Sequence, residues 1–181
     1  GDGAFYGPKI DVKLNDALGR PWQCATIQCD FSLPERFDLA YIDENNTPCR
    51  PIMLHRAILG SLERFMGTLI EHYAGAFPVW LAPTQILLIP IQEKHTGYAQ
   101  KIKEDLQSQG LRVIIDTRNE SLNKRIREGT LKKIPYILIM GDKEIADQKV
   151  AVRKFGAGDQ GSIPFNTFMQ SIQAEIFQKK C

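Results

Sequence analysis

The most regular hydrophobic pattern in the chain runs from Leu54 to Gly75. Placed on one helix at about 100° per residue, this stretch carries its large apolar side chains on one side. These residues are Ile58, Leu59, Leu62, Phe65, Met66, Leu69, Ile70 and Tyr73. Gly60 and Gly67 fall on the opposite arc with Arg64, although a glycine within a helix costs about 1 kcal/mol relative to alanine. Either a flat or phosphate-bearing ligand or another backbone must come close to this arc, and the pattern leaves both explanations open.

The residues before this predicted helix alternate as β-strands do. Pro8–Leu14 places apolar and polar side chains on opposite faces, Trp22–Phe31 forms a second run and Phe37–Ile42 a third. This order predicts an antiparallel sheet with a helix packed across it. Three or four strands and one helix leave a sheet edge and much of a sheet face uncovered, so this part is unfinished as a layered domain.

The pattern changes after Phe77–Pro83, a short link with two prolines. Ile86–Ile91 predicts a buried parallel strand, and Glu93–Gln109 predicts an amphipathic helix. A second helix is marked by Leu122, Ile126 and Leu131, and a final one starts at Pro164. Further strands are predicted at Leu111–Ile115, Pro135–Met140 and Gln148–Arg153. The order β-α-β-α-β-β-α predicts an α/β domain of two or three layers with right-handed crossovers. We therefore expect two domains, at residues 1–82 and 83–181.

Composition and cysteine usage are those of a cytoplasmic globular protein. The 181 residues are 43% hydrophobic and 24% charged, which is ordinary for a soluble chain. No apolar run approaches the ~20 residues of a membrane span, and no signal peptide opens the sequence. The cysteines, without CxxC spacing, favour free thiols in a reducing compartment. They are Cys24, Cys29, Cys49 and Cys181.

Charge is distributed unevenly along the chain. Residues 1–83 contain 7 Lys and Arg against 10 Asp and Glu, whereas residues 84–181 contain 16 against 11. The two parts therefore carry net charges of about −3 and +5. This asymmetry supports two domains and predicts an anionic partner, nucleic acid, for the second.

The residues alone show no complete catalytic or metal motif. His55, His72 and His95 lack zinc-ligand spacing, and on the helical interpretation His55 lies on the apolar side, so a core histidine is its default role. The sequence contains neither a Walker loop nor a GxSxG elbow. These observations support only a soluble two-domain protein whose basic α/β half binds nucleic acid.

Four segments carry a specific resemblance that covers essentially the whole chain. They are FYGPKIDV (Phe5–Val12), WQCATIQCDFSLPERF (Trp22–Phe37), HRAILGSLERFMGTLIEHYAGAFPVWLAP (His55–Pro83) and the GDKE to VAVR run (Gly141–Arg153). Together they resemble the bacterial threonyl-tRNA synthetase family. The resemblance implies the C-terminal part of a class II antiparallel catalytic sheet with its motif 3 helix. An α/β anticodon-binding domain with a mixed, mainly parallel sheet follows.

The resemblance also implies functions for residues of the first domain. Arg64 matches the motif 3 arginine that packs by the ATP adenine and reaches its terminal phosphates, as a planar guanidinium can. Lys9 is expected to contact phosphate, which makes Lys9 and Arg64 the catalytic candidates. Further positions match the lining of the aminoacyl-adenylate site: Tyr6, Gln23, Thr26, Gln28, Gly60 and Ser61.

His55 matches the last member of a Cys/His/His zinc site that recognises threonine in this family. Such a metal binds the amino and hydroxyl groups of the substrate and rejects valine, which has no hydroxyl. The other two ligands lie upstream of Gly1 in the family, and one imidazole does not hold zinc. Motifs 1 and 2 are also absent from the sequence. We therefore expect a C-terminal piece of a homodimeric enzyme that is inactive alone.

The implied reaction is attack of the threonine carboxylate on the ATP α-phosphate, assisted by arginines and Mg²⁺, followed by transfer to tRNA(Thr). In the second domain the resemblance assigns anticodon recognition to Asn119, Glu144 and Arg153. The resemblance also implies that nearby cationic side chains contact RNA phosphates. They are Lys143, Lys149, Arg118 and Lys124.

Two other functions stay open on the sequence. The chain can be a stand-alone RNA-binding module with a synthetase remnant, although its intact adenylate-site positions argue against that. It can also be an accessory subunit that supports a partner's dimerisation, although the basic second half argues against that.

Overall fold

The computed structural model describes residues 5–180 of the 181. The chain divides into two compact units, Gly1–His72 (unit 1) and Tyr73–Cys181 (unit 2), which are described separately. Cys24, Cys29 and Cys49 are free thiols, as predicted, whereas Cys181 lies outside the described residues. Within residues 5–180, no helix has the length and apolar character needed to cross a membrane.

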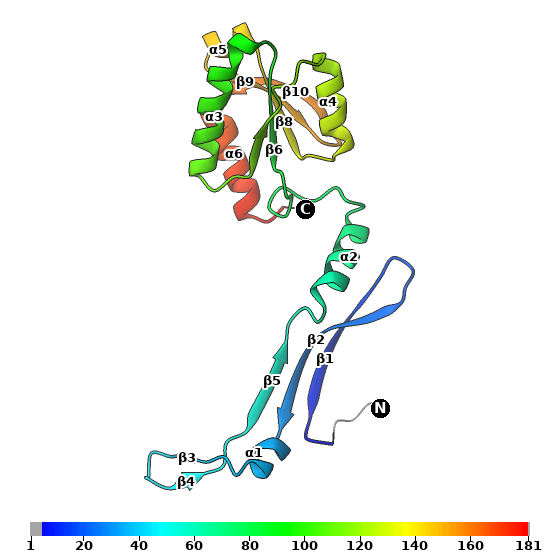
Figure 1. The fold of residues 1–181 in the computed structure, drawn as a ribbon, viewed down its shortest axis with the longest axis vertical. Coiled ribbons are helices and arrows are strands. Elements are labelled where there is room, and N and C mark those ends of the chain that lie inside the picture. The colour runs from blue at the N-terminus through cyan, green and yellow to red at the C-terminus, as the bar shows by residue number, and fades with distance from the viewer. Residues whose placement is uncertain (1–4, 181) are drawn as a thin grey trace. The chain divides into compact units, whose positions relative to one another are not determined.

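Unit 1 is built on a three-stranded antiparallel sheet in the order β1-β2-β5 (Figure 1). The strands are β1 (Lys9–Asn15), β2 (Pro21–Asp30) and β5 (Met53–Ala57). The connection from β2 to β5 contains the short helix α1 (Ser32–Arg36) and a small hairpin of β3 (Tyr41–Ile42) and β4 (Pro48–Cys49). Of the strand predicted at Phe37–Ile42, only the last two residues are extended. The predicted antiparallel sheet is confirmed.

The prediction of one helix from Leu54 to Gly75 is wrong. Its first residues belong to β5, where they pair with β2 from Cys29 opposite Leu54 to Thr26 opposite Ala57. Gly60 then adopts a φ of +63°, a left-handed conformation that cannot continue a right-handed helix. The helix α2 spans only Leu62–His72.

Ser61 caps the N-terminus of α2. Its carbonyl oxygen accepts from the Phe65 amide at 3.0 Å, and its hydroxyl accepts from the Arg64 amide at 3.4 Å. Serine is among the preferred residues at this position because its side chain satisfies an otherwise free helix amide. The helix therefore begins where its sequence supplies a cap.

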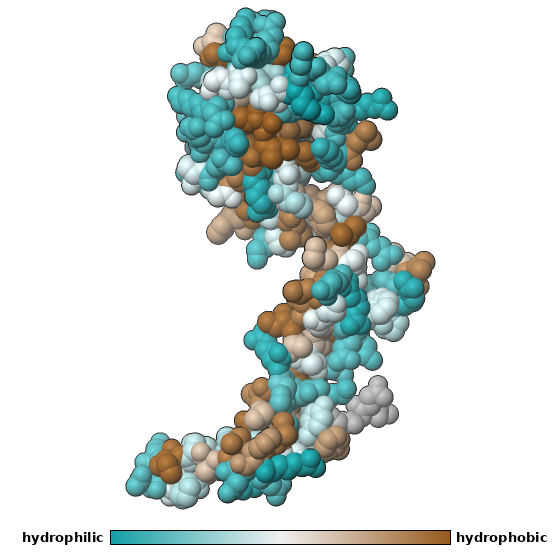
Figure 2. Space-filling model, in the orientation of Figure 1, coloured by the Kyte–Doolittle hydropathy of each residue, from teal (hydrophilic) through white to brown (hydrophobic). Residues whose placement is uncertain are grey.

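The apolar stripe of α2 is not part of a core in this unit. No residue of α2 is buried, and Leu62, Met66 and Ile70 are each about half exposed. Figure 1 shows α2 beyond the end of β5, not across the sheet. The apolar face of β1 is also exposed, and Figure 2 shows hydrophobic patches on the surface of this unit. The sheet thus keeps an uncovered face, as the count of its elements predicts.

Unit 2 contains a five-stranded mixed sheet in the order β10-β9-β8-β6-β7. Strands β6 (Ile86–Pro90), β7 (Val113–Ile115) and β8 (Tyr136–Met140) are parallel, as predicted. Strands β9 (Lys149–Lys154) and β10 (Gly158–Pro164) extend the sheet in antiparallel pairing. The sequence did not predict β10, whose glycines and polar residues lack a clear alternation.

Helices cover both faces of this sheet, so unit 2 has three layers (Figure 1). They are α3 (Thr96–Ser108) after the 3₁₀ turn η1 (Glu93–His95), α4 (Leu122–Leu131), α5 (Asp142–Ala146) and α6 (Phe165–Phe177). Apart from α5, these helices match the predicted ones. The mixed α/β fold class is confirmed.

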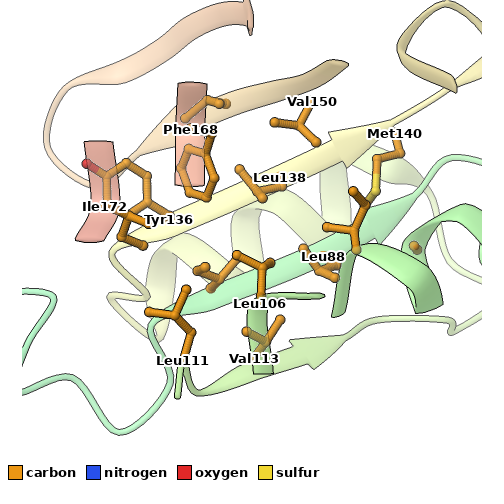
Figure 3. Packing of buried hydrophobic residues seen from close by; sticks show 14 of the residues in the cluster. Leu88, Leu106, Leu111, Val113, Tyr136, Leu138, Met140, Val150, Phe168 and Ile172 are labelled. Atoms are coloured by element: carbon orange, nitrogen blue, oxygen red, sulfur yellow. The ribbon is translucent and has the colours of Figure 1, made fainter. Parts of the chain in front are cut away.

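Successive side chains of β6 point into two separate cores. Ile86 and Leu88 face α3 and α6, where they join a cluster that includes Leu106 and Phe168 (Figure 3). Leu87 and Ile89 face α4 on the other side. A strand buried on both faces must be apolar at every position, which is why Ile86–Pro90 is a continuous apolar run.

Candidate functional site

Three predicted site residues form a row across the sheet of unit 1. In the strand register, Lys9 of β1 lies opposite Gln28 of β2, and Gln28 lies opposite His55 of β5. Alternation along β2 places Thr26, Gln28 and Asp30 on the same face. The sequence predictions therefore converge on one polar face, hereafter the polar face of unit 1.

A bulge in β2 brings Gln23 to this face. Val12 lies opposite Ala25 and Lys13 lies opposite Gln23, so Cys24 has no partner on β1. One extra residue shifts the alternation of the bulged strand by one position. Gln23 consequently points to the same side as Thr26, and its Nε2 donates to Asp11 Oδ1 at 2.8 Å.

Asp11 is the centre of this face, and the sequence analysis did not select it. Besides Gln23, its carboxylate accepts from the Thr26 hydroxyl at 2.6 Å and pairs with Lys9 Nζ at 3.0 Å. The hydrogen bond from Thr26 lowers the pKa of Asp11, and Lys9 lowers it further. In the sequence Asp11 alternates like any solvated strand residue, so no local signal distinguishes it.

Asp30 holds His55 in a defined orientation. The Asp30 carboxylate is 3% exposed, and its Oδ1 accepts from the backbone amides of Ser32 at 2.8 Å and Leu33 at 3.0 Å. Its Oδ2 lies 2.9 Å from His55 Nε2. The Leu33 amide is the largest cause of the lowered pKa of Asp30, and His55 contributes. Because an ionised carboxylate only accepts hydrogen bonds, His55 Nε2 is the donor, and in the neutral ring this leaves Nδ1 as an acceptor.

The position of His55 therefore corrects the expectation, drawn from the residue pattern, that it is a core histidine. It lies on strand β5 at the edge of a cavity, not inside a hydrophobic core, and its side chain is 39% exposed. The cavity has a volume of about 300 Å³ and also contains Tyr6 and Gln28. Its full lining is Phe5, Tyr6, Gln28, Asp30, Ser32, Leu33, Arg36 and His55. Across the described residues, no group of three or more His, Cys, Asp or Glu side chains forms a metal site.

Arg64 lies against an aromatic ring that the sequence analysis also missed. Its guanidinium carbon is 5.4 Å from the ring centroid of Trp22, and that of Arg20 is 5.8 Å from the same centroid. The buried Asp16 carboxylate accepts from Trp22 Nε1 at 2.9 Å and from Arg20 Nε at 2.6 Å. The Trp22 hydrogen bond is the largest cause that lowers the pKa of Asp16, to about 2. Trp22 is thereby fixed as a platform for Arg64.

Gly60 has a structural explanation. It lies in the turn before α2, and a Cβ there would lie 3.1 Å from the carbonyl oxygen of Cys24. The close approach of another backbone, together with the positive φ, accounts for this glycine. Gly67 has open space on its outer side. The adenosine contact expected at Gly60 stays a prediction, since it no longer follows from a helix face.

In unit 2, a second cavity of about 920 Å³ lies at the carboxyl ends of β6 and β7. Asn119, a predicted anticodon-recognition residue, lines it beside Arg118 and Arg125. The carboxyl end of β8 lies next to it, because the Ile91 amide donates to the Met140 carbonyl oxygen at 2.9 Å. Ligands commonly bind at this edge of α/β sheets.

Arg125 is not one of the surface cations that its helix presents. It is 4% exposed and donates through Nη1 to the carbonyl oxygens of Pro90 at 2.9 Å and Asp116 at 3.0 Å. Its Nη2 lies 3.4 Å from the Ile91 carbonyl oxygen. Arg125 thus joins the ends of β6 and β7 beneath the cavity.

The other predicted anticodon-site residues differ in their surroundings. Glu144 Oε2 accepts from the Gly141 amide at 3.1 Å, so this carboxylate caps α5. Arg153 Nη1 lies 3.3 Å from Asp159 and is opposite Ile137 on β8, away from the carboxyl end. The structure therefore places Glu144 near the same sheet edge as Asn119. Arg153 lies away from that edge.

Several of the predicted phosphate contacts are engaged in ion pairs. Arg118 binds Asp116 and Glu128, each at 2.6 Å. Lys124 pairs with Glu120 at 2.6 Å and Lys149 with Asp147 at 3.0 Å. Lys143 is exposed on α5. The exposed pairs of Lys124 and Lys149 are weak and exchange readily for other anions, whereas Arg118 makes a two-pronged contact with the buried Asp116 carboxylate.

Two family models match the chain. The model described as tRNA synthetase class II core domain (G, H, P, S and T) matches residues 1–73. The model described as anticodon binding domain matches residues 85–175. Each model covers the part of the chain that carries the corresponding candidate site.

Relatives over nearly the whole chain share one name. The threonine–tRNA ligase of Carboxydothermus hydrogenoformans is 58% identical over 99% of this chain and 28% of its own length. That of Acidobacterium capsulatum is 57% identical over 93% of this chain and 25% of its own length. The chain thus spans about a quarter of the length of these relatives.

A solved structure titled as the RNA binding domain of threonyl-tRNA synthetase from Cryptosporidium parvum has a TM-score of 0.86 and 41% identity. The match covers 97% of this chain and 44% of the chain in that structure. Giardia lamblia prolyl-tRNA synthetase shares the fold, with a TM-score of 0.72 at 22% identity. Domain matches, relatives and fold agree: the chain belongs to the threonine–tRNA ligase family of class II aminoacyl-tRNA synthetases.

Proposed function

We propose that this chain contributes one side of the aminoacyl-adenylate site and the anticodon-binding domain of a threonine–tRNA ligase. The activity is ATP-dependent formation of threonyl-adenylate and transfer of threonine to tRNA(Thr). The observation that carries the proposal is the polar face of unit 1, where Lys9, Gln28 and His55 align across three strands. Six of the nine residues proposed for substrate or metal lie on it or line its cavity: Tyr6, Lys9, Gln23, Thr26, Gln28 and His55.

The cations of unit 1 suit a nucleotide phosphate. Lys9 lies on the polar face, where its ammonium pairs with Asp11 beside Thr26. Arg64 is exposed beside the Trp22 ring, and a planar guanidinium can stack on a base and donate to phosphate oxygens. Ser61 and Gly60 precede α2 next to Arg64 and are assigned to the same site. Mg²⁺ accompanies ATP in this proposal, as phosphoryl chemistry of this type requires charge neutralisation.

His55 is suited to be one ligand of a zinc ion. Asp30 fixes its Nε2 and leaves Nδ1 as the coordinating atom, an arrangement common in carboxylate–histidine–metal units. The described residues supply no complete set of ligands, and the proposal places the other ligands outside the described residues. When bound, zinc would coordinate the amino and hydroxyl groups of threonine and so exclude valine.

In unit 2, Asn119 and Glu144 are assigned to base recognition at the carboxyl edge of the sheet, and Arg153 to a base further along β9. Lys143 and Lys149 are assigned to phosphate contacts. Lys149 and Arg153 are each paired with an aspartate, which an RNA phosphate or base can displace. The partner is tRNA(Thr), in a cytoplasmic homodimer.

Binding of RNA by the whole chain tests this function. We expect the tRNA(Thr) anticodon stem-loop to bind more tightly than a stem-loop with a changed central anticodon base, in fluorescence anisotropy at fixed salt. Glu144→Ala should reduce this discrimination, whereas Lys149→Ala should weaken both RNAs about equally. Equal binding of the two stem-loops by the unmodified chain would contradict the assignment. The opposite pattern in the two variants would reverse the roles of the two residues.

A second assay separates the ligase part from an RNA-binding module with a synthetase remnant. The sequence contains neither motif 1 nor motif 2, so we expect no ATP–pyrophosphate exchange from these 181 residues alone. A non-hydrolysable threonyl-adenylate analogue should nevertheless bind unit 1, and Arg64→Ala should weaken that binding. RNA discrimination without any binding of the analogue would favour the RNA-binding module.

A further inference from the structure

Asp11 has no assigned role, yet three residues of the proposed adenylate site converge on it. Thr26 Oγ1 lies 2.6 Å and Gln23 Nε2 2.8 Å from the same Oδ1 atom. Lys9 Nζ lies 3.0 Å from Oδ2. The Asp11 side chain is only 16% exposed, whereas its bond from Gln23 lies at the surface.

The chemistry of a carboxylate decides how these neighbours point. An ionised carboxylate accepts hydrogen bonds and donates none. The Thr26 hydroxyl must therefore direct its single hydrogen at Asp11, and Gln23 must direct its NH₂ group there. Thr26 keeps its hydroxyl lone pairs for a ligand, and Gln23 keeps its second N–H and its amide oxygen Oε1. Because the NH₂ group faces Asp11, Oε1 is the Gln23 atom directed away from the carboxylate, so both residues offer an acceptor there.

We propose that Asp11 is a positioning residue that presents Gln23 and Thr26 as hydrogen-bond acceptors beside the Lys9 ammonium. The ligand matched to this arrangement carries hydroxyl or amine donors next to an anionic group. This inference rests on the proposed function, since an aminoacyl-adenylate has hydroxyl and amino groups around its phosphate. Asp11 itself does not touch the ligand.

The geometry favours this role over a purely structural one. Gln23 is exposed, and a free glutamine amide at the surface can rotate so that either its oxygen or its nitrogen faces solvent. The β2 bulge turns Gln23 to the side of Asp11, and the carboxylate then selects one of its two amide orientations. A side chain that only filled space could not make that selection.

The variant that tests the selection is Asp11→Asn. It keeps the size and shape of the side chain but offers a donor as well as an acceptor, so Gln23 is no longer restricted to one orientation. The matched control is Asp38→Asn, because Asp38 is a highly exposed aspartate of the same unit that pairs with Arg50 at 3.0 Å. The control removes one surface carboxylate without touching the polar face.

Two measurements on the whole chain separate positioning from ligand binding. The first is the NMR scalar coupling across the hydrogen bond between Gln23 Nε2 and the Asp11 carboxylate carbon. The second is titration with a non-hydrolysable threonyl-adenylate analogue. We expect the coupling in the unmodified chain and in Asp38→Asn but not in Asp11→Asn. We expect Asp11→Asn to weaken the analogue by about tenfold or more, as loss of a well-placed hydrogen bond does, and Asp38→Asn to leave it unchanged.

The outcomes distinguish this proposal from the proposed function. Absence of the coupling in the unmodified chain overturns the positioning role. If the unmodified chain shows the coupling but Asp11→Asn binds the analogue with unchanged affinity, Asp11 is not important for ligand recognition. Coupling without any binding of the analogue by the unmodified chain contradicts the adenylate site itself. If Asp11→Asn does not fold, Gln23→Met replaces it as the test, because it leaves the Asp11 carboxylate intact. It should weaken binding of the analogue about as much. Unchanged affinity in Gln23→Met overturns the proposal.

Discussion

His95 Nε2 lies 3.1 Å from Asp142 Oδ1 and so ties the segment after β6 to the start of α5. The imidazole is almost fully buried, and its Nδ1 accepts from the Gln92 amide at 3.2 Å. Because Nδ1 accepts, Nε2 carries the hydrogen and donates it to Asp142. The ring thus uses both nitrogens to hold two loops at the carboxyl edge of the unit 2 sheet.

Removal of this link should loosen that edge. We expect His95→Ala to lower the free energy of opening by about 1–3 kcal/mol, since it removes a buried ring and leaves the partly buried Gln92 amide without its acceptor. Hydrogen exchange of the amides in β6 and β8 measures the change. Lys94→Ala is the control, because Lys94 binds the same Asp142 oxygen from the surface at 2.7 Å. It should change stability by no more than about 0.5 kcal/mol, and an equal effect of both variants would contradict the special role of His95.

Arg125→Met should destabilise unit 2 by about 2–4 kcal/mol. The methionine fills the same buried space but leaves the carbonyl oxygens of Pro90 and Asp116 without their donor. Hydrogen exchange of β7 and the amides that follow it measures the effect. Arg127→Met on the same helix is the matched control, since Arg127 is exposed. A loss below about 1 kcal/mol in Arg125→Met would show that water replaces the guanidinium without cost.

Acid should release the Trp22 platform of unit 1. The folded-state pKa of Asp16 is about 2, below its ordinary value of 3.8, so its ionised form stabilises the folded state above about pH 4. That stabilisation falls as the pH drops from about 4 to about 2, where the unfolded carboxyl takes up its proton first. Tryptophan fluorescence of the chain in this range should report the change. Asp16→Asn should remove the pH-dependent part, and an unaltered acid transition in that variant would contradict the assignment.

Side chains of similar type should differ in importance between the two units. Leu138 is fully buried, and Leu138→Ala should cost about 2–5 kcal/mol. Met66 on α2 is 58% exposed, and Met66→Ala should have little effect on the isolated chain. Thermal unfolding monitored by circular dichroism compares the two variants. Similar losses would mean that α2 is packed in solution in a way that its exposure does not indicate.

Local sequence patterns predicted most of unit 2. Strands such as Ile86–Pro90 and Tyr136–Met140 are buried on both faces, so their apolar runs are continuous and have no other explanation. The edge strand Gly158–Pro164 escaped prediction because backbone pairing with β9 holds it and its exposed side chains carry no pattern. The stretch from Leu54 was misassigned because an apolar period of 3.6 continued from α2 into residues that β2 recruits as a strand.

The candidate site was predictable by resemblance, but its internal organisation was not. Nothing near Asp11 in the sequence indicates contacts with Gln23 and Thr26, which are 12 and 15 residues away. The same holds for Asp30 and His55, which are 25 residues apart. These contacts depend on strand register and on one bulge, both of which form only when the sheet does.

The cap that Glu144 provides to α5 would couple the proposed base recognition to local folding. The helix has only five residues, and the Gly141 amide depends on the same carboxylate that is proposed to accept from a base. A base that displaces the Gly141 amide from Oε2 removes the cap of α5, at a cost of about 1 kcal/mol. A base that takes only Oε1 leaves the helix intact and meets an acceptor that is already oriented. If Glu144 reads a base as proposed, the cap therefore favours approach from the Oε1 side, whichever base approaches.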